Sequence, residues 1–127
     1  MQSGRLLLVH RSPGRRWYPD VWDLPGGHVH AGEEELTALR RELVEELGIE
    51  AVDVVEEPVA RISDPASALE LGMWVVRGWI GTPTNAAPDE HDEIRWVGAR
   101  ELASLELAHA GYVTLLTNLL RLSLIHI

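Results

Sequence analysis

The sequence contains no cysteine, no lysine and no phenylalanine among its 127 residues. The absence of cysteine excludes disulfide bonds and thiolate metal sites within the chain. All eleven basic residues are arginines, and twenty acidic residues bring the net charge to −9. Because no basic stripe offsets this charge, we do not expect binding to the backbone of a nucleic-acid polymer. A small phosphorylated substrate is still compatible with the charge, because a bound metal ion reverses the local sign.

Long hydrophobic runs are also absent, and no segment has the length needed to cross a membrane. No signal peptide is recognisable, so we expect a cytoplasmic protein without membrane contacts. The length suits one domain with a single core, and the hydrophobic fraction of 46% favours a folded globule. Neither internal repeats nor a linker divide the chain, which predicts one α/β domain, as a monomer or a homodimer.

The distribution of apolar residues and turn formers predicts the order of the elements. Apolar runs predict strands over residues 4–10, 21–24, 49–62, 69–80 and 93–98. Helical periodicity predicts helices over residues 34–47, 99–102 and 112–122. Residues 11–20 and 81–92 are predicted loops, and a turn around Ser63, Asp64 and Pro65 joins the third and fourth strands.

The predicted helix over residues 34–47 carries the clearest pattern. Leu36, Leu39, Leu43 and Leu47 form an apolar stripe at helical spacing. Glutamates at its start favour the helix dipole, and Gly48 suits a left-handed C-terminal cap. We therefore expect this helix to pack its leucines against a sheet.

Three glutamates of the same helix, Glu42, Glu45 and Glu46, lie beside the leucine stripe at spacings of i, i+3 and i+4. Such carboxylates repel one another unless a positive charge lies among them. Carboxylate oxygens are ligands that Mg²⁺ and Mn²⁺ prefer, and a free carboxylate can deprotonate an attacking water. Arg41 is placed to orient a carboxylate. The alternative is a solvated acidic helix face.

The spacing of residues 27–49 resembles the Nudix box, G-x5-E-x7-R-E-U-x-E-E-x-G-U, in which U is a bulky aliphatic residue. Residues 22–27, WDLPGG, also resemble the segment that precedes the box in many members. The resemblance implies an α/β/α sandwich with a mixed sheet and the box helix on one face. Every fixed position of the box matches: Gly27, Glu33, Arg41, Glu42, Leu43, Glu45, Glu46, Gly48 and Ile49.

The resemblance also implies roles within the box. Glu45 and Glu46 correspond to metal ligands, with Mg²⁺ or Mn²⁺ as the cofactor, and Glu42 corresponds to a ligand or the general base. The carbonyl of Gly26 completes the metal shell. The implied catalytic residues are Glu42, Arg41 and Glu45, with Glu33 pairing with Arg41.

Several members of the family use a further carboxylate outside the box. Glu93 is the candidate that we expect at the start of its strand and pointing into the cleft, as a further metal ligand. Glu90 is the alternative, in the preceding loop. The alternative for both glutamates is that they are surface residues without a role in the site.

Residues outside the box are candidates for substrate contact. Arg11, Arg16 and Trp22 are the predicted substrate-binding residues, with the arginines contacting phosphates and the indole stacking a base. Charge balance is the alternative for the arginines, and a core or anchoring role is the alternative for the indole. Weaker candidates are Arg15 on the same loop, Trp17, Tyr18, and the box-loop histidines His28 and His30.

The implied reaction is the hydrolysis of a pyrophosphate bond in a nucleoside diphosphate linked to another moiety. The short chain favours the MutT-like branch, acting on a (d)NTP or an oxidised (d)NTP and releasing the monophosphate and pyrophosphate. Pro65 weakly favours an ADP-ribose or other nucleotide-sugar pyrophosphatase. A non-catalytic nucleotide-binding module is the alternative of another class.

Both ends of the sequence differ from the family pattern. Residues 1–121 are the predicted domain, which lacks the strand that usually precedes residues 6–10. Its edge would then need cover, for example by dimerisation. Residues 122–127, LSLIHI, match the translation of a sequencing-adaptor end, so we expect a non-native scar. A natural apolar helix is the alternative.

Overall fold

The computed structural model describes residues 4–16, 18–26, 30–55, 57–58, 60–64, 69–109 and 111–125. The predictions for Trp17, Gly27, His28 and Pro65 concern residues outside this part. The elements, in chain order, are β1 (Leu6–Arg11), β2 (Trp22–Asp23), α1 (Glu35–Leu47), β3 (Glu50–Val54), β4 (Ala60–Asp64), β5 (Leu69–Met73), β6 (Val76–Ile80), β7 (His91–Val97), α2 (Ala99–Leu102) and α3 (Tyr112–Ile125).

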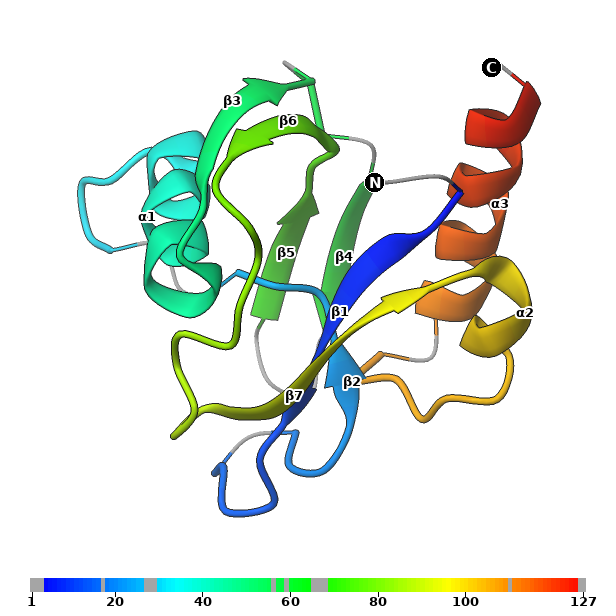
Figure 1. The fold of residues 1–127 in the computed structure, drawn as a ribbon, viewed down its shortest axis with the longest axis horizontal. Coiled ribbons are helices and arrows are strands. Elements are labelled where there is room, and N and C mark those ends of the chain that lie inside the picture. The colour runs from blue at the N-terminus through cyan, green and yellow to red at the C-terminus, as the bar shows by residue number, and fades with distance from the viewer. Residues whose placement is uncertain are drawn as a thin grey trace.

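Strand β1 lies at the centre of a three-stranded antiparallel sheet with the order β2-β1-β7. Figure 1 shows α1 on one side of this sheet and α2 with α3 on the other. Side chains alternate between the two faces of β1, so this strand contributes to the core on both sides of the sheet. Leu6 and Leu8 belong to the core cluster that contains Leu116 of α3, whereas Val9 belongs to the cluster of Leu43 on α1. This α/β/α arrangement confirms the predicted fold class.

All strand ladders in the described part of the chain are antiparallel, and the parallel pairing there is a single bridge between Trp22 and Leu107. In the described part of the chain, parallel pairing therefore occurs at the edge strand β2, where the segment after α2 returns to the sheet.

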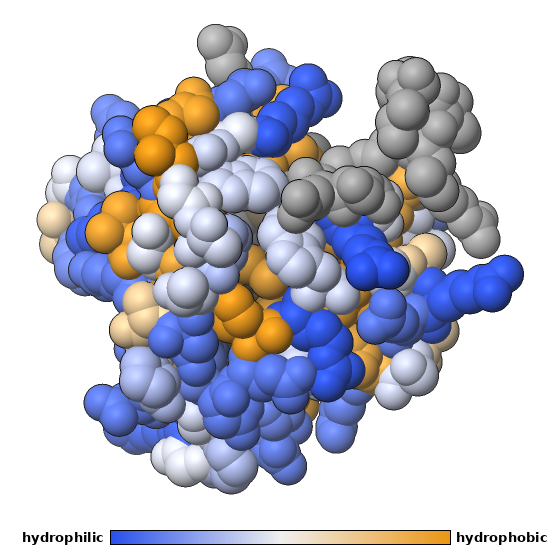
Figure 2. Space-filling view, viewed as in Figure 1, coloured by the Kyte–Doolittle hydropathy of each residue, from blue (hydrophilic) through white to orange (hydrophobic). Residues whose placement is uncertain are grey.

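None of the described helices is both long and apolar enough to cross a membrane. Figure 2 shows mainly hydrophilic side chains on one face, with separate hydrophobic patches.

The strands predicted over residues 49–62 and 69–80 are each divided in two. Strand β3 pairs with β6, and β4 pairs with β5, so the predicted hairpin is present but interrupted halfway. The interruptions lie opposite each other, and the Val55 N–H donates to the carbonyl of Val75 across them at 3.0 Å. Pro58 lies in the first interruption and lacks the N–H that a continuous ladder requires.

Helix α1 agrees with its sequence pattern. It begins at Glu35, one residue later than predicted, and ends at Leu47. Gly48 adopts φ +67°, and its N–H returns to the carbonyls of Leu43 and Val44, so the predicted left-handed cap is confirmed. The cap turns the chain directly into Ile49, which is buried in the α1 cluster.

We expect Gly48→Ala to lower the free energy of unfolding by about 1 kcal/mol, because a side chain disfavours the left-handed conformation. A Cβ atom at this position meets only the Thr84 hydroxyl, at 3.7 Å, so steric overlap adds little. Urea unfolding measures the change. Gly14→Ala is the matched control, since its Cβ atom meets nothing within 4 Å and its φ is not positive. Equal stability of both variants would contradict the assignment of the cap.

Candidate metal and catalytic site

The predicted pair of Glu33 and Arg41 joins the segment before α1 to the helix. Arg41 Nε donates to Glu33 Oε2 and Arg41 Nη2 donates to Glu33 Oε1, both at 3.0 Å. Glu33 Oε1 also accepts the N–H of His30 at 3.0 Å. These bonds, led by that from Arg41, lower the pKa of Glu33 to about 2. Two parallel bonds to a planar guanidinium fix the loop against the helix.

Arg41 also contacts two of the three helical glutamates. Its Nη1 donates to Glu42 Oε1 at 2.8 Å and lies 3.3 Å from Glu45 Oε2. The Glu42 side chain is 13% exposed, and that of Glu45 is 56% exposed. Arg41 therefore contacts both the mostly buried carboxylate of Glu42 and the exposed carboxylate of Glu45, as an orienting group would.

Glu46 is the third helical glutamate and is only 2% exposed. Its Oε2 accepts the N–H of Gly26 at 2.6 Å, and its Oε1 lies 3.3 Å from His91 Nε2. Burial raises the pKa of Glu46 to about 8, and the negative charges of Glu42 and Glu90 add to this rise. The hydrogen bond from the Gly26 N–H acts in the opposite direction and lowers the pKa. The effect of burial thus outweighs the groups that stabilise the ionised form of this carboxylate.

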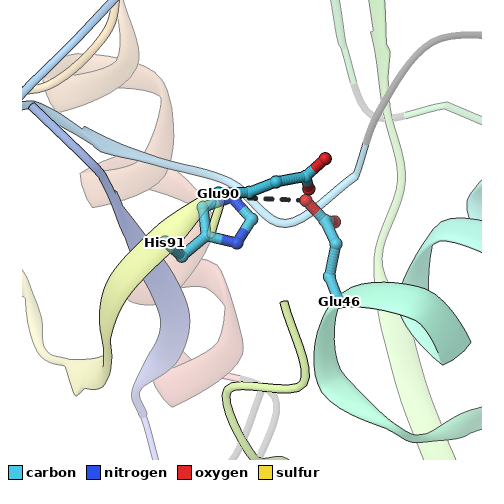
Figure 3. A group of neighbouring side chains, drawn as sticks. All are labelled: Glu46, Glu90 and His91. Atoms are coloured by element: carbon cyan, nitrogen blue, oxygen red, sulfur yellow. Dashed lines mark ion pairs between the residues drawn. The ribbon is translucent and has the colours of Figure 1, made fainter. Parts of the chain in front are cut away.

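Glu90 and His91 meet Glu46 from the turn before β7 and from the first residue of that strand (Figure 3). One ligand atom from each of these three residues lies within 4.8 Å of the others, the distance expected around a shared cation. Glu90 is exposed and His91 is buried. Burial, with the charges of Arg15 and Arg11, lowers the pKa of His91 to about 4.

The structure places Glu93 away from this group. The register of β1 and β7 shifts between the pairs His10–Glu93 and Arg11–His91, so Asp92 has no counterpart in β1. This bulge reverses the alternation, which leaves His91 buried and Glu93 exposed. Glu93 instead accepts two bonds from Arg95, at 3.0 and 2.7 Å. The arrangement favours Glu90 over Glu93 as the further carboxylate.

The predicted substrate-binding residues occupy different environments. Arg11 is mostly buried, donates from Nε to the carbonyl of Tyr18 at 2.9 Å, and so anchors the loop after β1. Arg16 is exposed on that loop. Trp22 is 8% exposed in the core cluster with Leu8, and the Arg95 guanidinium lies 4.8 Å from its ring centroid. Neighbours within the protein thus cover the indole, which favours the core role.

Sequence reasoning missed His91. The residue was visible beside Glu90, but the period-two pattern gives no reason to bury it, because the bulge at Asp92 is not marked by glycine or proline. A histidine directly after a candidate carboxylate was the available signal.

Comparison with known proteins agrees with this geometry. The family model of the NUDIX domain matches residues 1–119. The chain belongs to the Nudix family. It is 35% identical to the CTP pyrophosphohydrolase of Escherichia coli over 111 residues, which cover 86% of this chain and 78% of that protein. The chain is therefore a Nudix hydrolase.

Two further relatives are similar in sequence or structure. The 8-oxo-dGTP diphosphatase of Haemophilus influenzae is 34% identical over 82 residues, and this match covers 65% of the chain and 60% of that relative's length. The crystal structure of the MutT Nudix hydrolase from Burkholderia pseudomallei superposes with a TM-score of 0.74 at 28% identity, covering 92% of this chain and 90% of that one.

Arg41→Ala should lower both the melting temperature and the turnover rate, because it releases the segment around Glu33 and two glutamates of the acidic face. Arg61→Ala is the matched control, since Arg61 makes a similar two-bonded pair with Glu35 at a more exposed position. Thermal unfolding and hydrolysis assays measure the two effects. An Arg41→Ala protein that matches the control in both would show that the pair does not organise the site.

We expect Glu90→Gln to reduce hydrolysis in Mg²⁺ by about 10-fold or more, because it neutralises one carboxylate of the Glu46–Glu90–His91 group that could hold a cation. Glu93→Gln should leave the rate close to that of the wild type, because Glu93 faces Arg95. Steady-state kinetics at the Mg²⁺ concentration that half-saturates the wild type compare the two variants. A larger loss in Glu93→Gln would show that the bulge does not define the site.

Without divalent cations, the free energy of unfolding should fall as the pH rises from about 6.5 to about 8. In this range the folded protein keeps the Glu46 proton that the unfolded chain has released, so a higher pH favours unfolding. Below this range, the lowered pKa of His91 acts in the opposite direction. Urea unfolding in chelator at both ends of the range measures the change.

Glu46→Gln removes the titrating group and should abolish most of this pH dependence. A wild-type protein of equal stability at both ends would contradict the burial of an uncompensated carboxyl group.

Proposed function

We propose that this Nudix hydrolase cleaves a nucleoside triphosphate, normal or oxidised, to the monophosphate and pyrophosphate with Mg²⁺ or Mn²⁺. The observation that carries the proposal is the buried Glu46 carboxyl group beside Glu90, two acidic groups that a divalent cation would hold together in their ionised form. The names of the E. coli and H. influenzae relatives assign CTP and 8-oxo-dGTP to those proteins. The class that these compounds share, the nucleoside triphosphate, is what we extend to this chain.

The donor set fits such a cation. It starts from the Glu46 and Glu90 carboxylates, which offer oxygens within 4.8 Å of each other and are hard ligands of the kind that Mg²⁺ and Mn²⁺ prefer. The further ligands that we propose are the carbonyl of Gly26 and the carboxylates of Glu42 and Glu45, which pair with Arg41 outside this group. The ion, when bound, supplies positive charge against the phosphate oxygens of the substrate and favours the ionised form of a water molecule. The net charge of −9 makes such a counter-charge necessary for an anionic substrate.

The residues of the chain then have distinct roles. Water attacks one phosphorus, the anhydride P–O bond breaks, and pyrophosphate leaves. Glu42 or Glu45 accepts the water proton, because both carboxylates lie at the more accessible end of the acidic face. Arg41 holds these two carboxylates in place. Arg16 is exposed on the loop after β1 and is the arginine that we propose to contact the phosphates.

The test is a hydrolysis panel with CTP, dCTP, dGTP, 8-oxo-dGTP, ADP-ribose and a dinucleoside polyphosphate. Products are separated by anion-exchange chromatography, with Mg²⁺ in one arm and chelator in the other. We expect monophosphate and pyrophosphate from one triphosphate in the Mg²⁺ arm alone. Preferential cleavage of ADP-ribose would contradict the substrate class, and turnover in chelator would contradict the metal requirement.

Glu46→Gln should reduce turnover of the preferred nucleotide by about 100-fold or more, the size expected for loss of a group central to metal and acid–base chemistry. Glu101→Gln, at an exposed position of α2, is the control and should retain the wild-type rate. Circular dichroism verifies that both variants are folded. Full activity of a folded Glu46→Gln protein would contradict the site assignment.

A further inference from the structure

His91 is the buried polar group in the site that the reaction scheme leaves without a role. It is 1% exposed, and its Nε2 lies 3.3 Å from Glu46 Oε1. Its Nδ1 is buried and has no hydrogen-bond partner among the residues that the structure describes. Figure 3 shows the ring between the start of β7 and the Glu46 carboxylate.

Main-chain contacts hold the backbone of His91 without using the Glu46 side chain. The His91 N–H donates to the carbonyl of Ala87 at 3.0 Å, and the His91 carbonyl accepts from Asn85 Nδ2 at 2.6 Å. His91 also pairs with Arg11 in the sheet, next to the bulge at Asp92. The His91 backbone is therefore held by the loop before β7 and by β1, and its imidazole contacts the Glu46 carboxylate from this position.

We propose that His91 is a positioning residue, whose neutral imidazole donates a hydrogen bond from Nε2 to Glu46 Oε1 and so orients that carboxylate for a cation. The Gly26 N–H donates to the other oxygen at 2.6 Å, so one donor reaches each oxygen of the carboxylate. Each oxygen has two lone pairs, so one on each stays available beside Glu90. The inference rests on the proposed metal-dependent function.

The same geometry favours a donor role over direct metal ligation by the ring. The Nε2 atom lies 3.3 Å from Glu46 Oε1, where an N–H group can donate to the ionised carboxylate that a bound cation favours. The Nδ1 atom is enclosed by protein, with less than 1 Å² exposed. Hydrogen-bonded partners of metal-ligating carboxylates commonly change metal affinity by about 10- to 100-fold when removed.

The first test reads the imidazole proton directly in the wild-type protein. A long-range ¹H–¹⁵N NMR spectrum, which correlates the carbon-bound ring protons of histidine with both ring nitrogens, identifies the tautomer of His91 in the presence of Mg²⁺. We expect the proton on Nε2 and an unprotonated Nδ1. A proton on Nδ1, with Nε2 free to ligate the ion, would overturn the proposal. This measurement requires no variant and so does not depend on the folding of one.

The second test measures Mn²⁺ binding without substrate, by electron paramagnetic resonance. His91→Leu removes the donor and should weaken Mn²⁺ binding by about 10- to 100-fold. His91→Gln places an amide N–H near the position of Nε2 and should restore most of the affinity. Glu101→Gln, the exposed control on α2, should leave Mn²⁺ affinity unchanged.

The outcomes separate the two proposals. Wild-type affinity in a folded His91→Leu protein would overturn the positioning role and leave the metal-dependent function intact. Failure of the wild type to bind Mn²⁺ would overturn the proposed function and this inference with it. Equal losses in His91→Leu and His91→Gln would show that bulk rather than the N–H matters, and would also overturn the inference.

Discussion

The burial of the Glu46 carboxylate is the constraint on which the site depends. An ionised carboxylate is costly to bury without a compensating charge, and two N–H donors reduce that cost without removing it. The Gly26 N–H and the His91 ring approach opposite oxygens, while Glu42 and Glu90 add negative charge. A divalent cation resolves this conflict, so the destabilised group is also the one suited to bind it.

Three separate elements must converge for this arrangement to form. Helix α1 supplies Glu46, the segment after β2 supplies Gly26, and the start of β7 with the turn before it supplies His91 and Glu90. The Glu33–Arg41 pair fixes the segment before the helix, and the leucine stripe fixes the helix against the central sheet. Because these contacts are far apart in the chain, the site is assembled by the fold as a whole.

Local patterns in the sequence were sufficient for the helix and its glycine cap, and the resemblance to the Nudix box was sufficient for the Glu33–Arg41 pair. All three depend on residues less than fifteen positions apart. The choice between Glu90 and Glu93 was not accessible, because it depends on a bulge that reverses the faces of β7. The interruption of the long hairpin was likewise hidden, apart from Pro58, because the opposing break carries no turn residue. Sequence periodicity describes regular elements, and the site lies where the regularity is broken.

The most direct measurement is the stability of the wild-type protein as a function of free Mg²⁺ at near-neutral pH. A ligand that binds only the folded state raises the free energy of unfolding by RT ln(1 + [L]/Kd). Urea unfolding over a range of Mg²⁺ concentrations, with NaCl at matched ionic strength as the control, should show a logarithmic increase with Mg²⁺ alone. The same stability in Mg²⁺ and in the matched salt would contradict the claim that the buried carboxylate is built to hold a divalent cation.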